Sequence, residues 1–184
     1  MAEITYQMVL STIQTAGILM GIVYYIFNMR NQQRTRELTL KAQEQTLETR
    51  QSQLFMNIYN QSYANPEFIK AVRKVHTTQW NDYEEWINLY DYHNLSPADP
   101  EFVDAFSHVA MFYEGLGVFV KERLIDIRLV ALTMTNMTRS TWEKIVPFIE
   151  EHRKKTSFPR FLSEFEYLYD ELMRYVEEHP ELKT

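Results

Sequence analysis

The longest uncharged stretch of the chain lies near its start. No acidic or basic side chain occurs between Glu3 and Arg30, a run of 26 residues. A helix of about 20 apolar residues crosses the hydrocarbon core of a bilayer, so the pattern predicts a transmembrane helix over residues 6–27, preceded by an N-terminal stub at residues 1–5. A cleaved signal peptide would need a basic start and a shorter apolar core, and this stretch has neither.

The predicted span is not uniformly apolar. Successive residues of a helix are about 100° apart, so one arc of about 120° collects most of the polar and small side chains. We call it the polar face, and it comprises Gln7, Ser11, Gln14, Gly17, Gly21 and Asn28. Two glycines four residues apart let membrane helices approach closely, and glutamine in lipid needs a hydrogen-bond partner. The polar face is therefore a candidate helix–helix interface, and a lone anchor with an accidental glycine pair is the alternative.

Basic residues cluster directly after the span, at Arg30, Arg34 and Arg36. Lysine and arginine mark the cytoplasmic end of membrane helices. We therefore expect a single-pass protein of the plasma (inner) membrane, with the N-terminus outside and the C-terminal domain in the cytoplasm. The same arginines are candidate contacts for anionic lipid headgroups. No nucleic-acid partner is expected, because the net charge is −6 and the basic cluster adjoins the span.

Strong helix formers without glycine or proline fill residues 28–58, which predicts a helical stalk that continues the span. Three leucines recur at seven-residue spacing: Leu40, Leu47 and Leu54. A seven-residue repeat of leucine is typical of one of the two core positions of a coiled coil. The residues at the other core position are polar here: Glu37, Glu44 and Gln51. Because a stable coiled coil needs apolar residues at both positions, we expect a stalk that self-associates weakly by itself.

The remainder, residues 59–184, has the periodicity of a compact bundle of five or six helices. The clearest helix begins at Pro100, where apolar residues follow alternating steps of four and three: Phe102, Phe106, Val109, Tyr113, Leu116 and Val120. Further helices are expected over residues 66–76, 83–93, 124–134, 140–155 and 159–179, with a loop over residues 93–100. No segment alternates with period two. The predicted fold class is therefore all-α: a transmembrane helix, a stalk and a helical domain.

Several residues predict how these helices begin and pack. Asn65 has the side chain of an N-cap. Ser140 with Glu143 three residues later fits a capping box, in which the two side chains cap the start of one helix. Gly115 and Gly117 lie inside the helix that begins at Pro100, where each costs about 1 kcal/mol relative to alanine. We expect them to permit close helix packing.

Three runs in the predicted domain carry a resemblance: YEGLGVFVKERLIDI, WEKIVPFIEE and PRFLSEFEYLYDEL. They resemble a family of uncharacterised prokaryotic proteins that pair an N-terminal membrane helix with an all-helical domain of unknown function. The resemblance covers about residues 60–175. It implies one span and one helical domain, and it implies no activity, cofactor or catalytic residue.

Residues with catalytic potential are few. The chain has no cysteine, which excludes thiolate catalysis and cysteine-ligated zinc. No glycine-rich phosphate loop is present. Glu101, Asp104 and His108 share one helix and are weak candidates for a metal site, although a di-metal bundle needs Glu-x-x-His twice and the chain has no such motif. Glu114 could have a raised pKa and act in proton chemistry, but we expect it to pair with an arginine or to be solvated.

These patterns favour a non-enzymatic, membrane-anchored scaffold or accessory subunit without a cofactor. Its partners would be membrane lipid and either further copies of itself, in a homo-oligomer, or other membrane-protein subunits. Two alternatives stay open. One is a regulatory domain that binds a small ligand or a partner helix, and the other is a metal-dependent helical-bundle enzyme.

Overall fold

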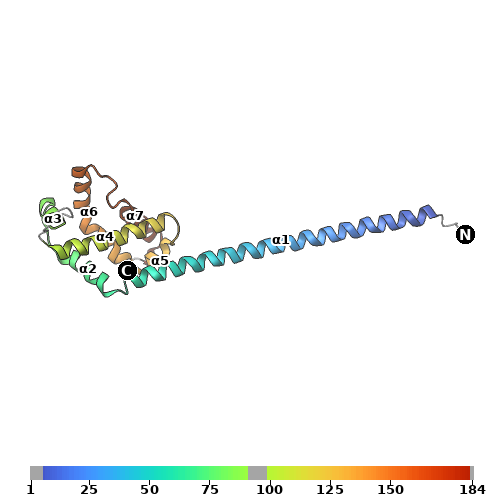
Figure 1. Cartoon of the computed structure of the whole chain (residues 1–184), viewed down its shortest axis with the longest axis horizontal. Coiled ribbons are helices and arrows are strands. Elements are labelled where there is room, and N and C mark those ends of the chain that lie inside the picture. The colour runs from blue at the N-terminus through green and yellow to red at the C-terminus, as the bar shows by residue number, and fades with distance from the viewer. Residues whose placement is uncertain (1–5, 91–98, 183–184) are drawn as a thin grey trace. The chain divides into compact units, whose positions relative to one another are not determined.

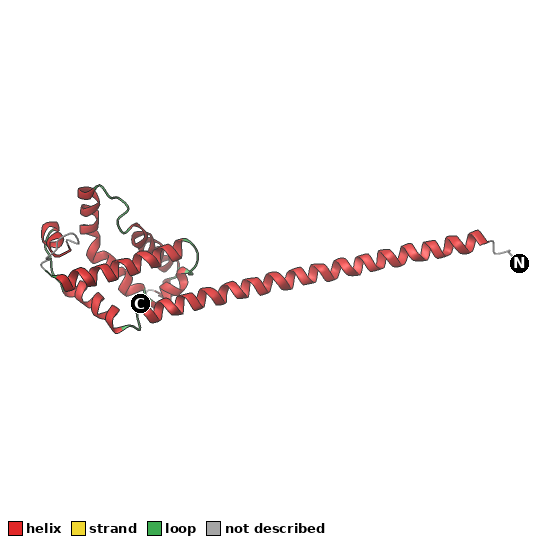
Figure 2. Cartoon of the chain, viewed as in Figure 1, coloured by secondary structure: helices red, strands yellow, loops and turns green. Residues whose placement is uncertain are grey.

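The computed structural model describes residues 6–90 and 99–182. These residues form seven α-helices and one short 3-10 helix, and they contain no strand (Figure 1, Figure 2). The predicted all-α fold class is confirmed. The predicted stub at residues 1–5 and most of the predicted loop at residues 93–100 lie outside the described residues.

Helix α1 (Tyr6–Gln61) is one unbroken helix that includes both the predicted span and the predicted stalk. Contacts within the chain divide it into two compact units, one up to Thr49 and one from Arg50 onward. We call the second unit the helical domain. It starts earlier than the predicted boundary at residues 58 and 59, because the last turns of α1 already pack on the core: Phe55 is buried, and Leu54 lies against the buried cluster.

Six more α-helices complete the described part of the helical domain. They are α2 (Pro66–Thr77), α3 (Tyr83–Tyr90), α4 (Pro100–Lys121), α5 (Ile127–Thr133), α6 (Thr135–Thr156) and α7 (Ser163–Glu178), followed by the 3-10 turn η1 (Pro180–Leu182). Helix α4 packs against both α2 and α7, so it is the central element of the domain (Figure 1).

The core is built on the apolar stripe of α4. All six residues of the predicted stripe are buried: Phe102, Phe106, Val109, Tyr113, Leu116 and Val120. Helix α7 adds Phe165, Leu168 and Leu172, each fully buried. Burying one such side chain contributes about 1.5–3 kcal/mol relative to leaving it in water. The shared stripe therefore holds the two helices together.

Local capping explains where α2 begins, as predicted. The Asn65 side chain accepts a hydrogen bond from the Glu67 backbone N–H at 2.9 Å, and Pro66 occupies the first helical position, where its missing N–H costs nothing.

The predicted capping box at Ser140 is wrong. Helix α6 begins at Thr135, so Ser140 lies inside it, and the Glu143 carboxylate pairs with Arg139 at 2.9 Å instead. The buried side chains of Thr138 and Thr141 explain the earlier start, because packing draws this segment into the helix. Tertiary contacts thus override the local capping signal.

Helices α4 and α7 approach closely at Gly117. A Cβ built on Gly117 would lie 1.9 Å from the backbone carbonyl oxygen of Glu164, far inside contact distance. A Cβ built on Gly115 would meet nothing within 4 Å. The expectation of close packing is therefore confirmed for Gly117. No other helix of the described helical domain packs closely against Gly115.

These two glycines provide a matched pair of variants. We expect Gly117→Ala to lower the free energy of unfolding by about 1–3 kcal/mol, because the methyl group forces the backbones apart. Gly115→Ala removes the helix penalty of glycine and should raise the same quantity by up to about 1 kcal/mol. Both free-energy changes are measured by urea unfolding of the full chain, monitored by circular dichroism in detergent with one chain per micelle. Equal effects of the two substitutions would contradict the close approach.

Candidate functional site

The predicted polar face lies on α1, and its hydrogen bonding differs from that of the other polar residues in the span. Two threonines lie outside the predicted arc, and each satisfies its hydroxyl within the helix. Thr12 Oγ1 donates to the Met8 carbonyl at 2.8 Å, and Thr15 Oγ1 donates to the Ser11 carbonyl at 2.9 Å. The polar side chains of the arc make no such bond within the described chain: Gln7, Ser11, Gln14 and Asn28. Their hydrogen-bonding groups are therefore free for a partner.

The two glycines of the polar face leave it open to close approach. A Cβ added at Gly17 or at Gly21 would meet nothing within 4 Å. All side chains from Tyr6 to Arg50 are exposed in the single chain. The backbone at these glycines is thus accessible to a second helix, and the intervening turn presents no bulky side chain on the arc except Ile18.

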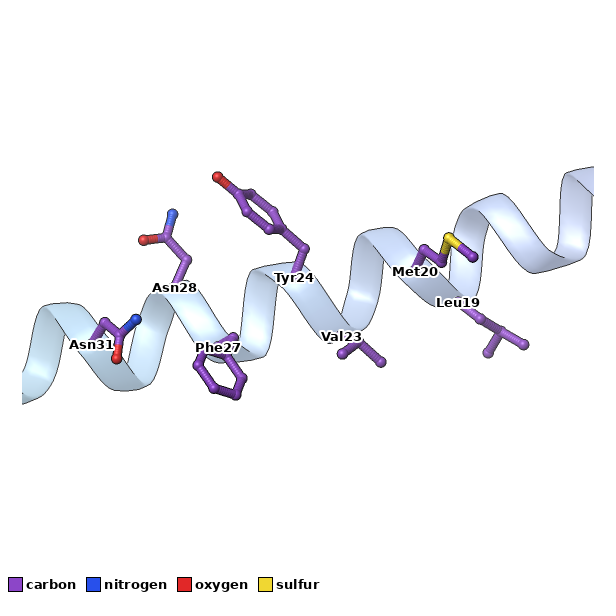
Figure 3. A pocket seen from close by; sticks show the side chains of 7 residues that line it. All are labelled: Leu19, Met20, Val23, Tyr24, Phe27, Asn28 and Asn31. Carbon is purple, nitrogen blue, oxygen red and sulfur yellow. The ribbon is translucent and has the colours of Figure 1, made fainter.

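The far side of the same helix has a different character (Figure 3). Large side chains surround an open hollow of about 620 Å³: Leu19, Met20, Val23, Tyr24, Phe27, Asn28 and Asn31. Its walls come from one helix alone, so it is a surface depression and encloses nothing. Asn28 borders both this hollow and the polar face. Tyr24 lies near the end of the predicted span, where tyrosine is typical of a membrane–water interface.

The predicted leucine repeat is divided between the two units. Leu40 and Leu47 are exposed, whereas Leu54 packs against the core of the helical domain. Gln51, at a complementary position, donates from Nε2 to the Arg123 carbonyl at 2.9 Å. Gln51 and Leu54 thus make contacts inside the chain, and the exposed part of the repeat is confined to two leucines.

The predicted lipid-headgroup residues follow on the same helix. Arg30, Arg34 and Arg36 are exposed, and none of them forms an ion pair within residues 6–90 and 99–182. Their guanidinium groups are therefore available to external anions, as headgroup binding requires.

The weak metal candidates line one wall of a surface groove between α2 and α4. The groove has a volume of about 470 Å³, and Glu101, Asp104 and His108 all border it. The opposite wall carries three basic side chains of α2 that were not predicted as site residues: Lys70, Arg73 and Lys74. Their spacing along one amphipathic helix would have placed them on one face.

This charge pattern gives no support to a metal site. Lys74 forms an ion pair with Asp99 at 2.7 Å and lies 3.9 Å from Glu101. Among the described residues, no group of three or more histidine, aspartate or glutamate side chains is arranged to hold a metal ion. The charged walls also differ from the apolar pocket expected of a ligand-binding regulatory domain.

Glu114 has a partner that the sequence did not reveal. Its Oε2 accepts hydrogen bonds from the backbone N–H groups of Phe165 at 2.8 Å and Glu164 at 3.1 Å. These are free donors at the start of α7, where the N-cap position holds Leu162 and supplies no side-chain acceptor. Burial raises the pKa of the Glu114 carboxyl, and the two N–H donors act in the opposite direction. Of the two expectations, an arginine partner and solvation, neither describes this contact.

A lysine side chain likewise binds free backbone groups at the end of α2, where the groups are carbonyls. Lys144 Nζ donates to the backbone carbonyls of His76 at 2.6 Å and Thr78 at 2.8 Å, and it lies 4.5 Å from the centre of the Trp80 ring. Burial lowers the pKa of Lys144. Both contacts join helices that are distant in sequence, so sequence periodicity carried no signal of them.

The part of the chain that the structure describes is all-α, and within it one helix, α1, is long and apolar enough to span a membrane. A family model described as a domain of unknown function (DUF4760) matches residues 11–172. The chain belongs to this family, which confirms the resemblance to an uncharacterised family. The matched residues include most of the predicted span, the predicted stalk and most of the helical domain. No curated protein and no solved structure matches the chain.

The contact of Glu114 can be tested by substitution. Glu114→Ala leaves two N–H groups without an acceptor, so we expect the free energy of unfolding to fall by about 1–2 kcal/mol. Glu114→Gln keeps one acceptor oxygen and should lose less. Glu150→Ala, at an exposed position of α6, is the control and should have little effect. Thermal or urea unfolding of the full chain measures all three, and an equal loss for alanine and glutamine would contradict the capping role.

Proposed function

We propose that this protein is a single-pass membrane protein that assembles through the polar face of α1, acting as a non-catalytic scaffold or accessory subunit. The observation that carries the proposal is the contrast within the span. Threonines outside the arc satisfy their hydroxyls internally, whereas Gln7 and Gln14 on the arc do not. In hydrocarbon, an amide without a partner is costly, and a facing helix supplies the missing hydrogen bonds.

The exposure of the apolar stretch supports the membrane location. No residue in the most apolar part of α1 is buried within the described chain. A core helix of a water-soluble protein would cover such a surface with its own chain. In a membrane, lipid would cover the apolar surface of α1 without any further protein. A partner helix would then contact only the polar face.

The basic cluster after the span supports the orientation that we propose. Arg30, Arg34 and Arg36 lie on the C-terminal side of the apolar stretch, and the segment before it has no lysine or arginine. By the positive-inside rule, the helical domain then faces the cytoplasm, and the membrane is the inner membrane. The three exposed arginines lie where they can contact anionic headgroups.

Assembly through the span is testable by crosslinking in membranes. We expect Gly17→Ile/Gly21→Ile to reduce the crosslinked oligomer severalfold, because the added side chains hold the helices apart. Ala16→Ile/Met20→Ile is the matched control, with the same spacing on the far side of the helix, and should leave the oligomer ladder unchanged. Identical ladders for both double variants would exclude the polar face as the interface.

The orientation is tested by fusing reporters to the C-terminus. We expect a green fluorescent protein fusion to fluoresce and an alkaline phosphatase fusion to be inactive. Replacing Arg30, Arg34 and Arg36 by glutamine should raise phosphatase activity, because the orienting charge is lost. Glutamine at Lys70, Arg73 and Arg128 is the control and should change neither reporter. An active phosphatase fusion of the unmodified chain would reverse the proposed topology.

A further inference from the structure

A second seven-residue pattern runs along α1, on a different side of the helix from Leu40 and Leu47. It takes alternating steps of four and three residues and contains five of the six residues of the polar face. We call this line the seam. Its members in and next to the predicted span are Gln7, Ser11, Gln14, Ile18, Gly21, Tyr25 and Asn28. Its members further along the stalk are Gln32, Thr35, Thr39, Ala42, Thr46 and Thr49.

The seam carries no charge over its whole length. Residues 28–50 contain eight acidic or basic side chains, and none of them occupies a seam position. The positions directly opposite the seam change with the surrounding medium. They are apolar in the predicted span and charged in the stalk: Val9, Ala16 and Val23, then Arg30, Glu37 and Glu44. The outer side of α1 is thus matched first to lipid and then to water, whereas the seam is matched to neither.

The four threonines of the seam satisfy their hydroxyl groups within α1. Each Oγ1 donates to the backbone carbonyl one turn earlier: Thr35 to Asn31 and Thr39 to Thr35 at 2.9 Å, Thr46 to Ala42 at 2.7 Å, and Thr49 to Gln45 at 2.8 Å. A partner helix can cover such a hydroxyl without leaving it unsatisfied. The rest of the side chain is one methyl group, so these positions can be buried as small apolar residues are.

The period and the length of the seam restrict what can cover it. On a straight helix, a strict seven-residue repeat drifts by about 20° per heptad, so it stays in contact only with a helix that winds around the first. From Gln7 to Thr49 the seam advances by 42 residues, which is about 60 Å of helix. The covering helix must therefore cross the bilayer and continue into water beside the stalk. Among the described residues, α1 is the one helix with these properties.

We propose that α1 pairs with α1 of a second copy, as a parallel, left-handed coiled coil along the whole seam. The pairing rests on the assembly through the polar face proposed above, to which it adds the partner and a continuation into the stalk. Copies inserted into one membrane in one orientation are parallel, so each seam residue faces the same residue of the other copy. Gln7 and Gln14 then face their own counterparts, and each amide can both donate and accept.

The residues beside the seam are compatible with this register. In a parallel pair, a residue before the seam meets the residue five positions further on in the other helix. The pairs in the stalk are Asn31 with Arg36, Leu38 with Gln43, and Gln45 with Arg50, so no two like charges oppose each other. Glycine pairs also occur in right-handed contacts, and it is the seven-residue period that sets the left hand.

The span makes a weak contact in the stalk effective. The stalk part of the seam has few large apolar residues, so two isolated stalks would associate weakly. Two copies joined through their spans hold their stalks at a high effective concentration, and pairing there becomes an intramolecular step.

Because the chain has no cysteine, single cysteine substitutions in the full-length protein test the pairing in the stalk. After oxidation in membranes, we expect Thr39→Cys and Ala42→Cys to give severalfold more disulfide dimer than Glu37→Cys and Leu40→Cys. All four positions are exposed in the single chain, but only the first two face their own counterparts. Equal yields at the four positions, or a maximum at Leu40, would overturn the proposal.

Like charges on the seam provide a second test. Thr39→Glu/Thr46→Glu sets glutamates against each other and should lower the dimer yield of Ala42→Cys severalfold. Leu40→Glu/Leu47→Glu is the matched control, since it adds the same charge one position along, on the outer side, and should leave the yield unchanged. Circular dichroism checks that both variants keep their helix content. The same loss in both variants would reject the seam as the contact.

The identity of the partner is tested with two differently tagged copies expressed together. We expect the disulfide product of Ala42→Cys to carry both tags, and a product in which one tagged chain is joined to a different protein would overturn the proposal.

The proposed function and the pairing along the stalk can fail separately. Equal dimer yields along the stalk, with an oligomer ladder that Gly17→Ile/Gly21→Ile reduces, would overturn the coiled coil and leave assembly through the polar face supported. A ladder that these glycine substitutions do not change would instead reject the polar face, whatever the yields along the stalk.

Discussion

The contact between the middle of α4 and the start of α7 is the constraint on which the rest of the helical domain depends. Three residues of α4, each a turn apart, hold α7: Glu114 accepts its free N–H groups, Gly117 lets the Glu164 carbonyl approach, and Lys121 Nζ pairs with the Glu164 carboxylate at 2.8 Å. The buried ring of Tyr113 then stacks on Phe165, with ring centres 4.5 Å apart. The polar contacts and the stacked rings thus set the same register of α7 on α4.

Sequence periodicity predicted the elements of this contact but not the contact itself. The six buried residues of α4 follow a regular apolar spacing, and the cap at Asn65 uses a local hydrogen bond, so both are readable from neighbouring residues. Glu114 binds a backbone N–H that is 50 residues away in the chain. Lys144 binds two backbone carbonyls that are 66 and 68 residues away. Their targets are peptide groups, which every residue has, so no residue type along the chain marked them.

The candidate site also has features that could be predicted from the sequence and features that could not. The polar face of α1 was predictable, because it depends only on helical geometry and residue type, and α1 is indeed one helix. Which of its polar groups lack a partner was not predictable, because threonine can bond to its own helix and glutamine here does not. The groove between α2 and α4 was missed for another reason. Its basic wall and its acidic wall belong to helices that only the fold brings together.

The dependence of the core on α7 has a consequence for how the protein is made. Helix α7 follows every other α-helix that the structure describes, and it contributes Phe165, Leu168 and Leu172 to the core. While the ribosome is still translating the segment before it, α4 has no partner for Glu114, and the part of its apolar stripe that packs on α7 stays uncovered. A span near the N-terminus would by then have left the ribosome. Membrane insertion would therefore precede folding, and the nascent domain would complete its core while already tethered to the bilayer.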